Sequence, residues 1–248
     1  MVGPSAALVF YKRQLLVLPF IIVFLDEQSI SIWFFFLILN RLRDIFDFGY
    51  LDNVSRHISY IKGGGKSNSE ISTLYLYAGH VYKRSALACF IISFFIGSVG
   101  LFIKGFNVIE DWQFYLALLV ISLSNSIFIY GNRYISILFG MDYISKIKSW
   151  DTLFTILNIL SLLCFLNEGV TVLILVTINS FWLILCVFRN GIMLNRIFND
   201  LILNVNLLGK GNYNFNLIRD NARREFVASL FSVGYFQLFN FVISLYLP

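Results

Sequence analysis

The residues that could do chemistry in this sequence are charged side chains inside long hydrophobic segments. One such segment, residues 30–50, contains Asn40 and the four charged residues Arg41, Arg43, Asp44 and Asp47. If the segment crosses a membrane as a helix, Arg41 lies about 16 Å from its start, near the bilayer midplane. An arginine at that depth costs at least ~2.5 kcal/mol to insert, so its side chain is expected to face the protein interior.

Helical spacing gives these charges two interpretations. Arg41 and Asp44 are neighbours at i, i+3, and Arg43 and Asp47 are neighbours at i, i+4. They could form two structural ion pairs, or they could line a polar cavity that binds a substrate. Both interpretations stay open, and the second makes Arg41 and Asp44 candidate substrate-binding residues.

A second polar stripe lies in the segment 112–133. Its members, Ser122, Asn125, Ser126 and Arg133, follow one another at steps of 3, 1 and 7 residues. Small hydroxyl residues are common where membrane helices pack together, and this favours packing for the serines. For Arg133 the simpler interpretation is that its guanidinium reaches the lipid headgroups. The cavity hypothesis instead adds Asn125 and Arg133 to the candidate binding residues.

The sequence contains no recognisable catalytic or metal-binding pattern. His57 and His80 have no cysteine or carboxylate at ligand spacing, and the glycines at 63–65 lack the spacing of a phosphate-binding loop. We therefore expect a protein that is not an enzyme and that uses no cofactor and no metal.

The elements that position these residues follow from composition. Of the 248 residues, 58% are hydrophobic and only 13% are charged, so lipid must cover most of the surface. The apolar runs are long and continuous, as in helices rather than barrel strands. They occupy residues 6–25, 30–50, 85–103, 112–133, 150–166, 170–188 and 226–247. The sequence predicts an all-α integral membrane protein, a polytopic bundle of six transmembrane helices plus a terminal seventh.

The distribution of basic residues predicts the orientation. With a cytoplasmic N-terminus, 16 of the 19 lysines and arginines fall on the cytoplasmic side or at its boundary, as the positive-inside rule requires. The outer turns are then 26–29, 104–111 and 167–169, which are too short for an extracytoplasmic domain. The net charge of +5 is thereby assigned to the membrane surface, and no nucleic-acid partner is expected.

Several short motifs carry a family resemblance. In order they are LLVLPFIIVF (residues 15–24), SIWFFFLI (31–38), DFGY (47–50), SRHISY (55–60), KGGG (62–65) and YISILFGMDYISKIK (134–148). The chain resembles the first part of Wzx-type polysaccharide (O-antigen) flippases of the multidrug/oligosaccharidyl-lipid/polysaccharide exporter superfamily. The match covers most of the chain in helix order and about half of it in recognisable residues.

This resemblance implies a fold and a function. It implies one lobe of a two-lobed transporter, with a six-helix transmembrane lobe at 1–190, a cytoplasmic linker at 191–225 and the first helix of a truncated second lobe at 226–248. It also implies transport of undecaprenyl-pyrophosphate-linked oligosaccharide from the cytoplasmic to the periplasmic face of the bacterial inner membrane. The implied partners are this lipid-linked glycan, membrane lipid and other membrane proteins of polysaccharide assembly.

Three other functions remain as alternatives. A drug/cation antiporter of the same superfamily would need a cavity led by carboxylates, whereas here each of Asp44 and Asp47 has an arginine at helical spacing. A membrane-embedded polysaccharide polymerase would need a large outer loop. A scaffold subunit would not explain the charges inside the hydrophobic segments.

Overall fold

The computed structural model describes residues 19–64, 68–106, 111–166, 170–197, 216–229 and 231 of the chain. Its elements are α2 (Glu27–Leu42), the 3-10 turn η1 (Ile45–Asp47), α3 (Tyr50–Gly63), α4 (Asn68–Ile103), α5 (Trp112–Gly140), α6 (Ile144–Phe165), α7 (Val172–Ile197) and α9 (Asn216–Ser229). Throughout these ranges every regular element is a helix, and the prediction of an all-helical protein is confirmed for them. The predicted spans 6–25 and 226–247 lie largely outside the described residues.

Within the described residues, four helices are long and apolar enough to cross a membrane. They are α4, from Glu70 onward, and α5, α6 and α7 along their whole lengths. Many of their large apolar side chains are exposed, including Phe95, Phe102 and Phe181, as expected for surfaces that lie against lipid. The chain is therefore described as a helical membrane protein.

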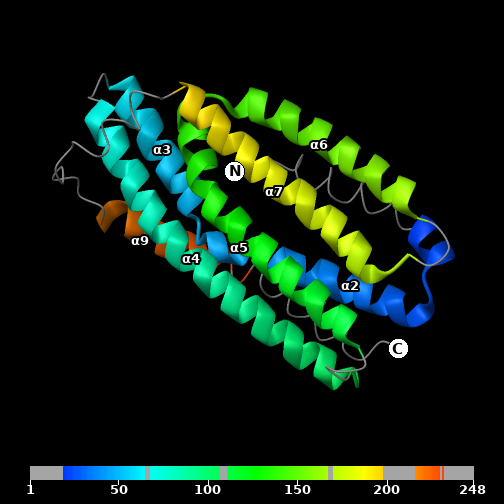
Figure 1. The fold of residues 1–248 in the computed structure, drawn as a ribbon. Coiled ribbons are helices and arrows are strands. Elements are labelled where there is room, and N and C mark those ends of the chain that lie inside the picture. Colours follow the sequence, from blue (N-terminus) through cyan, green and yellow to red (C-terminus); the bar gives the residue numbers. More distant parts are fainter. Residues whose placement is uncertain are drawn as a thin grey trace.

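Helix α5 is the centre of the bundle. It packs against α4 on one side and α7 on the other, with α3 near its C-terminal end and α6 against α7 (Figure 1). The α5–α7 contact requires a glycine, because a Cβ at Gly131 would lie 2.7 Å from Val187. The predicted interhelical role of Asn158 is confirmed, since its amide donates to Asn179 across the α6–α7 interface at 3.2 Å.

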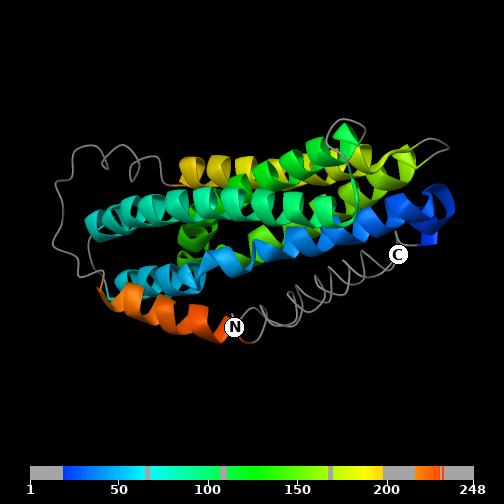
Figure 2. The same cartoon turned by 90° about the horizontal axis from the view of Figure 1, so that it is seen from below.

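The helix ends separate into two groups. The starts of α2 and α5 and the ends of α4 and α6 lie at one end of the bundle (Figure 2). At that end Asp26 begins α2 by accepting the Ser29 backbone N–H, and its hydrogen bonds to Ser29 lower the pKa of the Asp26 carboxyl. The end of α3 and the start of α4 lie at the opposite end, where α9 also packs along α3.

The segment expected to be one helix from Ile30 to Tyr50 is broken. Helix α2 stops at Leu42, and α3 begins at Tyr50 after the short turn η1. The break follows from Phe48 and Gly49, whose φ angles of 52° and 70° are left-handed and cannot continue a right-handed helix. A side chain at Gly49 would also lie 2.7 Å from Glu225 of α9. The hydrophobic pattern of the sequence did not indicate this break.

Between the predicted spans 30–50 and 85–103 the sequence predicts a long inner loop at residues 56–84, and the structure differs. Most of this segment is helical, because α3 runs to Gly63 and α4 begins at Asn68. Helix α5 likewise continues to Gly140, and α7 continues to Ile197, beyond the ends of the predicted spans at residues 133 and 188. Hydropathy marks only the length of helix that faces lipid, while the polar ends of the same helices remain helical through packing on one another.

Candidate functional site

Buried polar side chains occur along the length of α5. They are Ser122, Ser124, Asn125, Asn132 and Ser136, each less than 5% exposed. Ser124 is satisfied, since its hydroxyl contacts the Ser180 hydroxyl of α7 at 3.1 Å. In contrast, the Ser122 hydroxyl and both polar atoms of the Asn125 amide are buried and have no hydrogen-bond partner among the described residues. The predicted candidate Asn125 is thus an open hydrogen-bonding group at the centre of the bundle.

Arg133, another predicted candidate, lies among tyrosines. Its guanidinium carbon is 3.9 Å from the ring centroid of Tyr130, 4.5 Å from that of Tyr134 and 5.7 Å from that of Tyr75 on α4. It donates to the Tyr134 hydroxyl. Its buried Nε has no hydrogen-bond partner within the described ranges, where it also forms no ion pair. The side chain is therefore held by aromatic rings, and no carboxylate neutralises it there.

Asp47, in the turn η1, accepts hydrogen bonds from α3, α4 and α5. Its Oδ1 accepts the Asn132 amide of α5 at 2.9 Å and the Tyr82 hydroxyl of α4 at 3.2 Å. Its Oδ2 accepts the backbone N–H of Leu51, at the start of α3, at 3.2 Å. The possible ion pair between Arg43 and Asp47 is not formed, because the break after α2 places the Asp47 side chain against α4 and α5.

The structure pairs Arg43 with Asp44 instead. Arg43 Nε is 3.7 Å from Asp44 Oδ1, and the Arg43 guanidinium lies over the Phe128 ring of α5 at 4.4 Å. The Asp44 side chain is 61% exposed, so it points away from the α5 interface. Arg43 and Asp47 thus contact α5, through Phe128 and Asn132, whereas the candidates named from the sequence were Arg41 and Asp44.

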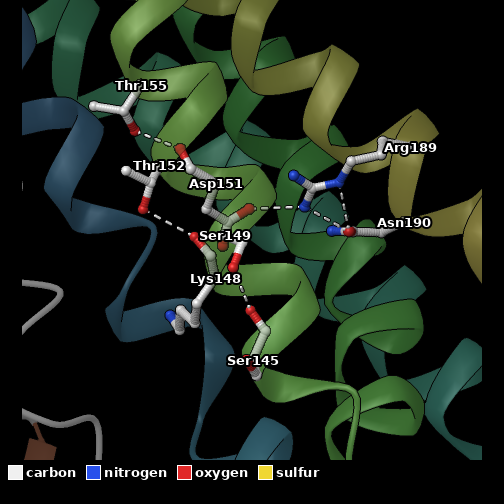
Figure 3. A network of polar contacts seen from close by, with 8 residues as sticks. All are labelled: Ser145, Lys148, Ser149, Asp151, Thr152, Thr155, Arg189 and Asn190. Carbon is white, nitrogen blue, oxygen red and sulfur yellow. Dashed lines mark hydrogen bonds and ion pairs between the residues drawn. The ribbon is translucent and has the colours of Figure 1, made fainter.

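Another polar cluster joins α6 to α7 and contains an ion pair (Figure 3). Arg189 Nη2 lies 2.7 Å from Asp151 Oδ1 and also donates to the side-chain oxygen of Asn190. Phe154 covers the guanidinium at 5.1 Å. This arrangement is that of an ion pair that fastens two helices.

Several residues of the site were missed by sequence reasoning. Tyr82, completely buried, and Asn132 have no sequence signal that sets them apart, because the carboxylate they contact lies 35 and 85 residues away. Asp47 could have been found, since the glycine two residues later is a signal for a helix break. Among the described residues no group of histidine, cysteine and acidic side chains could hold a metal ion.

Among the described residues, this arrangement can hold a polar or anionic group but offers no nucleophile with an adjacent base. No family model matches the chain, and neither a curated protein nor a solved structure matches it.

Proposed function

We propose that this chain is a lobe of a polysaccharide flippase of the bacterial inner membrane. It carries undecaprenyl-pyrophosphate-linked oligosaccharide from the cytoplasmic to the periplasmic face. In this proposal the N-terminus is cytoplasmic, six helices form the lobe and a seventh begins a second lobe. The substrate path runs along the polar side of α5.

The observation that carries the proposal is the set of unpartnered polar atoms buried on α5. The Ser122 hydroxyl, both polar atoms of Asn125, the Asn132 Oδ1 and the Arg133 Nε all belong to it. A buried polar atom without a partner costs about 1–3 kcal/mol. One helix that retains several of them is better explained by a polar substrate or water that occupies the path than by packing alone.

Arg133 supplies the group that recognises a phosphate. A guanidinium is planar and presents donors in a fixed fork, so it can hold phosphate oxygens at two points. The tyrosine rings keep the Arg133 guanidinium in place without neutralising it. A lipid pyrophosphate that enters from the cytoplasmic side would reach Arg133 before Asn125, because Arg133 lies nearer the C-terminal end of α5.

The test is complementation of a strain that lacks its own copy of the gene, with surface polysaccharide measured on a gel. Asn125→Leu, which fills the same space without polar atoms, should abolish export while the protein remains folded and inserted. Asn158→Leu is the matched control, because this buried asparagine serves the α6–α7 contact. Normal export by Asn125→Leu would contradict the proposed path.

Asp47 favours a second candidate function, that of a drug/cation antiporter. Its contacts in the described residues come from neutral donors, so no arginine there neutralises the carboxylate. A buried carboxylate of this kind could bind a proton or a cationic substrate. Asp47→Asn should then abolish resistance to cationic drugs in a sensitised strain. A flippase instead predicts unchanged resistance and reduced surface polysaccharide.

A further inference from the structure

A hollow of about 610 Å³ lies where the end of α3 meets the turn between α5 and α6. Its lining does not include the buried polar residues of α5 described above, such as Asn125 and Asn132. Its polar lining consists of Ser55, Arg56, Ser59, Tyr60 and Lys62 from α3, and Asp142 from the turn.

Direct contacts hold the two walls of this hollow together. The Ser59 hydroxyl donates to the Gly140 carbonyl at 3.1 Å, and Lys62 Nζ donates to the Met141 carbonyl at 3.2 Å. A Cβ at Gly140 would lie 2.5 Å from the Ile58 side chain, so this close approach requires glycine. The hollow is therefore preformed by tight packing of α3 on the end of α5.

Both signs of charge are available inside it. Arg56 uses one of its five N–H groups in a 3.3 Å ion pair with Glu225 of α9, and Lys62 uses one of its three on the Met141 carbonyl. The other N–H groups of both side chains are left for a ligand. The Asp142 carboxylate has no side-chain partner in the part of the chain that the structure describes, and its backbone is fixed at a φ of 72°. The hollow thus has cations on its α3 wall and a carboxylate on its turn wall.

The position of the hollow along α5, relative to the thickness of a bilayer, indicates which kind of ligand could reach it. Helix α5 has 29 residues and is about 43 Å long, compared with about 40–45 Å for a bilayer including its headgroups. With Trp112 at one interface, the hollow beyond Gly140 lies among the headgroups of the other leaflet. Two large side chains at its edge, Tyr60 and Ile144, are 74% and 44% exposed and suit the glycerol and upper acyl region of a lipid.

We propose that this hollow binds the headgroup of a zwitterionic phospholipid that carries a phosphate and a primary ammonium, as phosphoethanolamine does. Arg56 and Lys62 bind the phosphate, and Asp142 accepts the ammonium N–H groups. An anionic headgroup without an ammonium would leave Asp142 without a partner. A trimethylated ammonium could not donate a hydrogen bond to the carboxylate. The site is independent of the transport proposed above.

The experiment measures binding of phosphatidylethanolamine, phosphatidylcholine and phosphatidylglycerol to the purified chain in detergent by native mass spectrometry. The wild type should bind phosphatidylethanolamine most tightly. Asp142→Asn should weaken that binding about tenfold, as expected for one charge-assisted hydrogen bond, and should not weaken phosphatidylglycerol binding. Asparagine tolerates the left-handed backbone at this position, so the turn should be kept.

The double variant Arg56→Gln with Lys62→Gln should weaken binding of all three lipids about tenfold or more. Glutamine at 62 can still donate to the Met141 carbonyl. Lys146→Gln and Asp220→Asn are controls, because they remove exposed charges outside the hollow. Unfolding temperatures without lipid will show that each variant is folded. Equal binding of the three lipids by the wild type, or unchanged binding by folded Asp142→Asn, would overturn the proposal.

Discussion

Two arginines on neighbouring helices have opposite surroundings. Arg189 on α7 and Arg133 on α5 lie at similar heights, since Val187 contacts Gly131 and Tyr134 lies beside Gly191. Arg189 has a carboxylate at 2.7 Å and an asparagine oxygen, whereas Arg133 has tyrosine rings and no carboxylate partner among the described residues. Each of the two keeps one buried guanidinium nitrogen without a hydrogen-bond partner there. Arg189 therefore holds two helices together, whereas we infer that Arg133 binds an anionic ligand.

The largest expected effect is on Arg133. Arg133→Gln should lower export about a hundredfold, because two charge-assisted hydrogen bonds to phosphate are together worth about 3 kcal/mol. Arg133→Lys should retain part of the activity, since an ammonium lacks the two-point fork. Surface polysaccharide per amount of membrane-inserted protein is the measurement. Full export by Arg133→Gln would place Arg133 in the same structural class as Arg189.

Removal of the partner of Arg189 should affect stability instead. Asp151→Ala should lower the free energy of unfolding by about 2 kcal/mol, less than the 3–5 kcal/mol for a fully buried pair, because the Asp151 side chain is 40% exposed. Export per folded protein should not change. Thermal unfolding in detergent measures the effect. The control is Asp220→Ala, which removes half of an exposed pair and should change stability by less than about 0.5 kcal/mol.

A carboxylate placed beside Arg133 should make it resemble Arg189. A Cβ at Gly79 of α4 would lie 3.7 Å from Arg133 Nη1, which is an ordinary contact distance. Gly79→Asp should therefore neutralise the guanidinium and lower export about tenfold, the equivalent of 1.4 kcal/mol. Gly79→Ala adds the same Cβ without charge and should keep export while it stabilises α4 by about 0.5–1 kcal/mol. Equal export by the two variants would argue against a ligand at Arg133.

The smallest effect concerns the ring nearest to Arg133. Tyr130→Leu removes a cation–π contact at 3.9 Å and should lower stability by about 0.5–1 kcal/mol beyond the change in packing. Tyr130→Phe keeps the ring and should retain most of this stability. Chemical unfolding of both variants provides the comparison. A loss as large for Phe as for Leu would mean that the hydroxyl, rather than the ring, holds the arginine.

The sequence predicted those features that depend on neighbouring residues. Hydropathy located parts of α4, α5, α6 and α7, and the polar stripe with Asn125 and Arg133 was found from helical spacing. The partners of Asp47 could not be predicted, because Tyr82 and Asn132 are brought to it by packing of α4 and α5 on the helix break. For the same reason nothing in the sequence indicated that Arg189 would pair with Asp151, 38 residues away.

The break between α2 and α3 places charged side chains beside two helix ends. Every helix carries a partial negative charge at its C-terminal end and a partial positive charge at its N-terminal end. Arg41 and Arg43 stand at the C-terminal end of α2, and Asp47 receives the Leu51 N–H at the N-terminal end of α3. Each side chain therefore opposes the partial charge of the helix end beside it. Helix α2, with 16 residues and a length of about 24 Å, is shorter than a 30 Å hydrocarbon layer, and these side chains compensate the partial charge at its end.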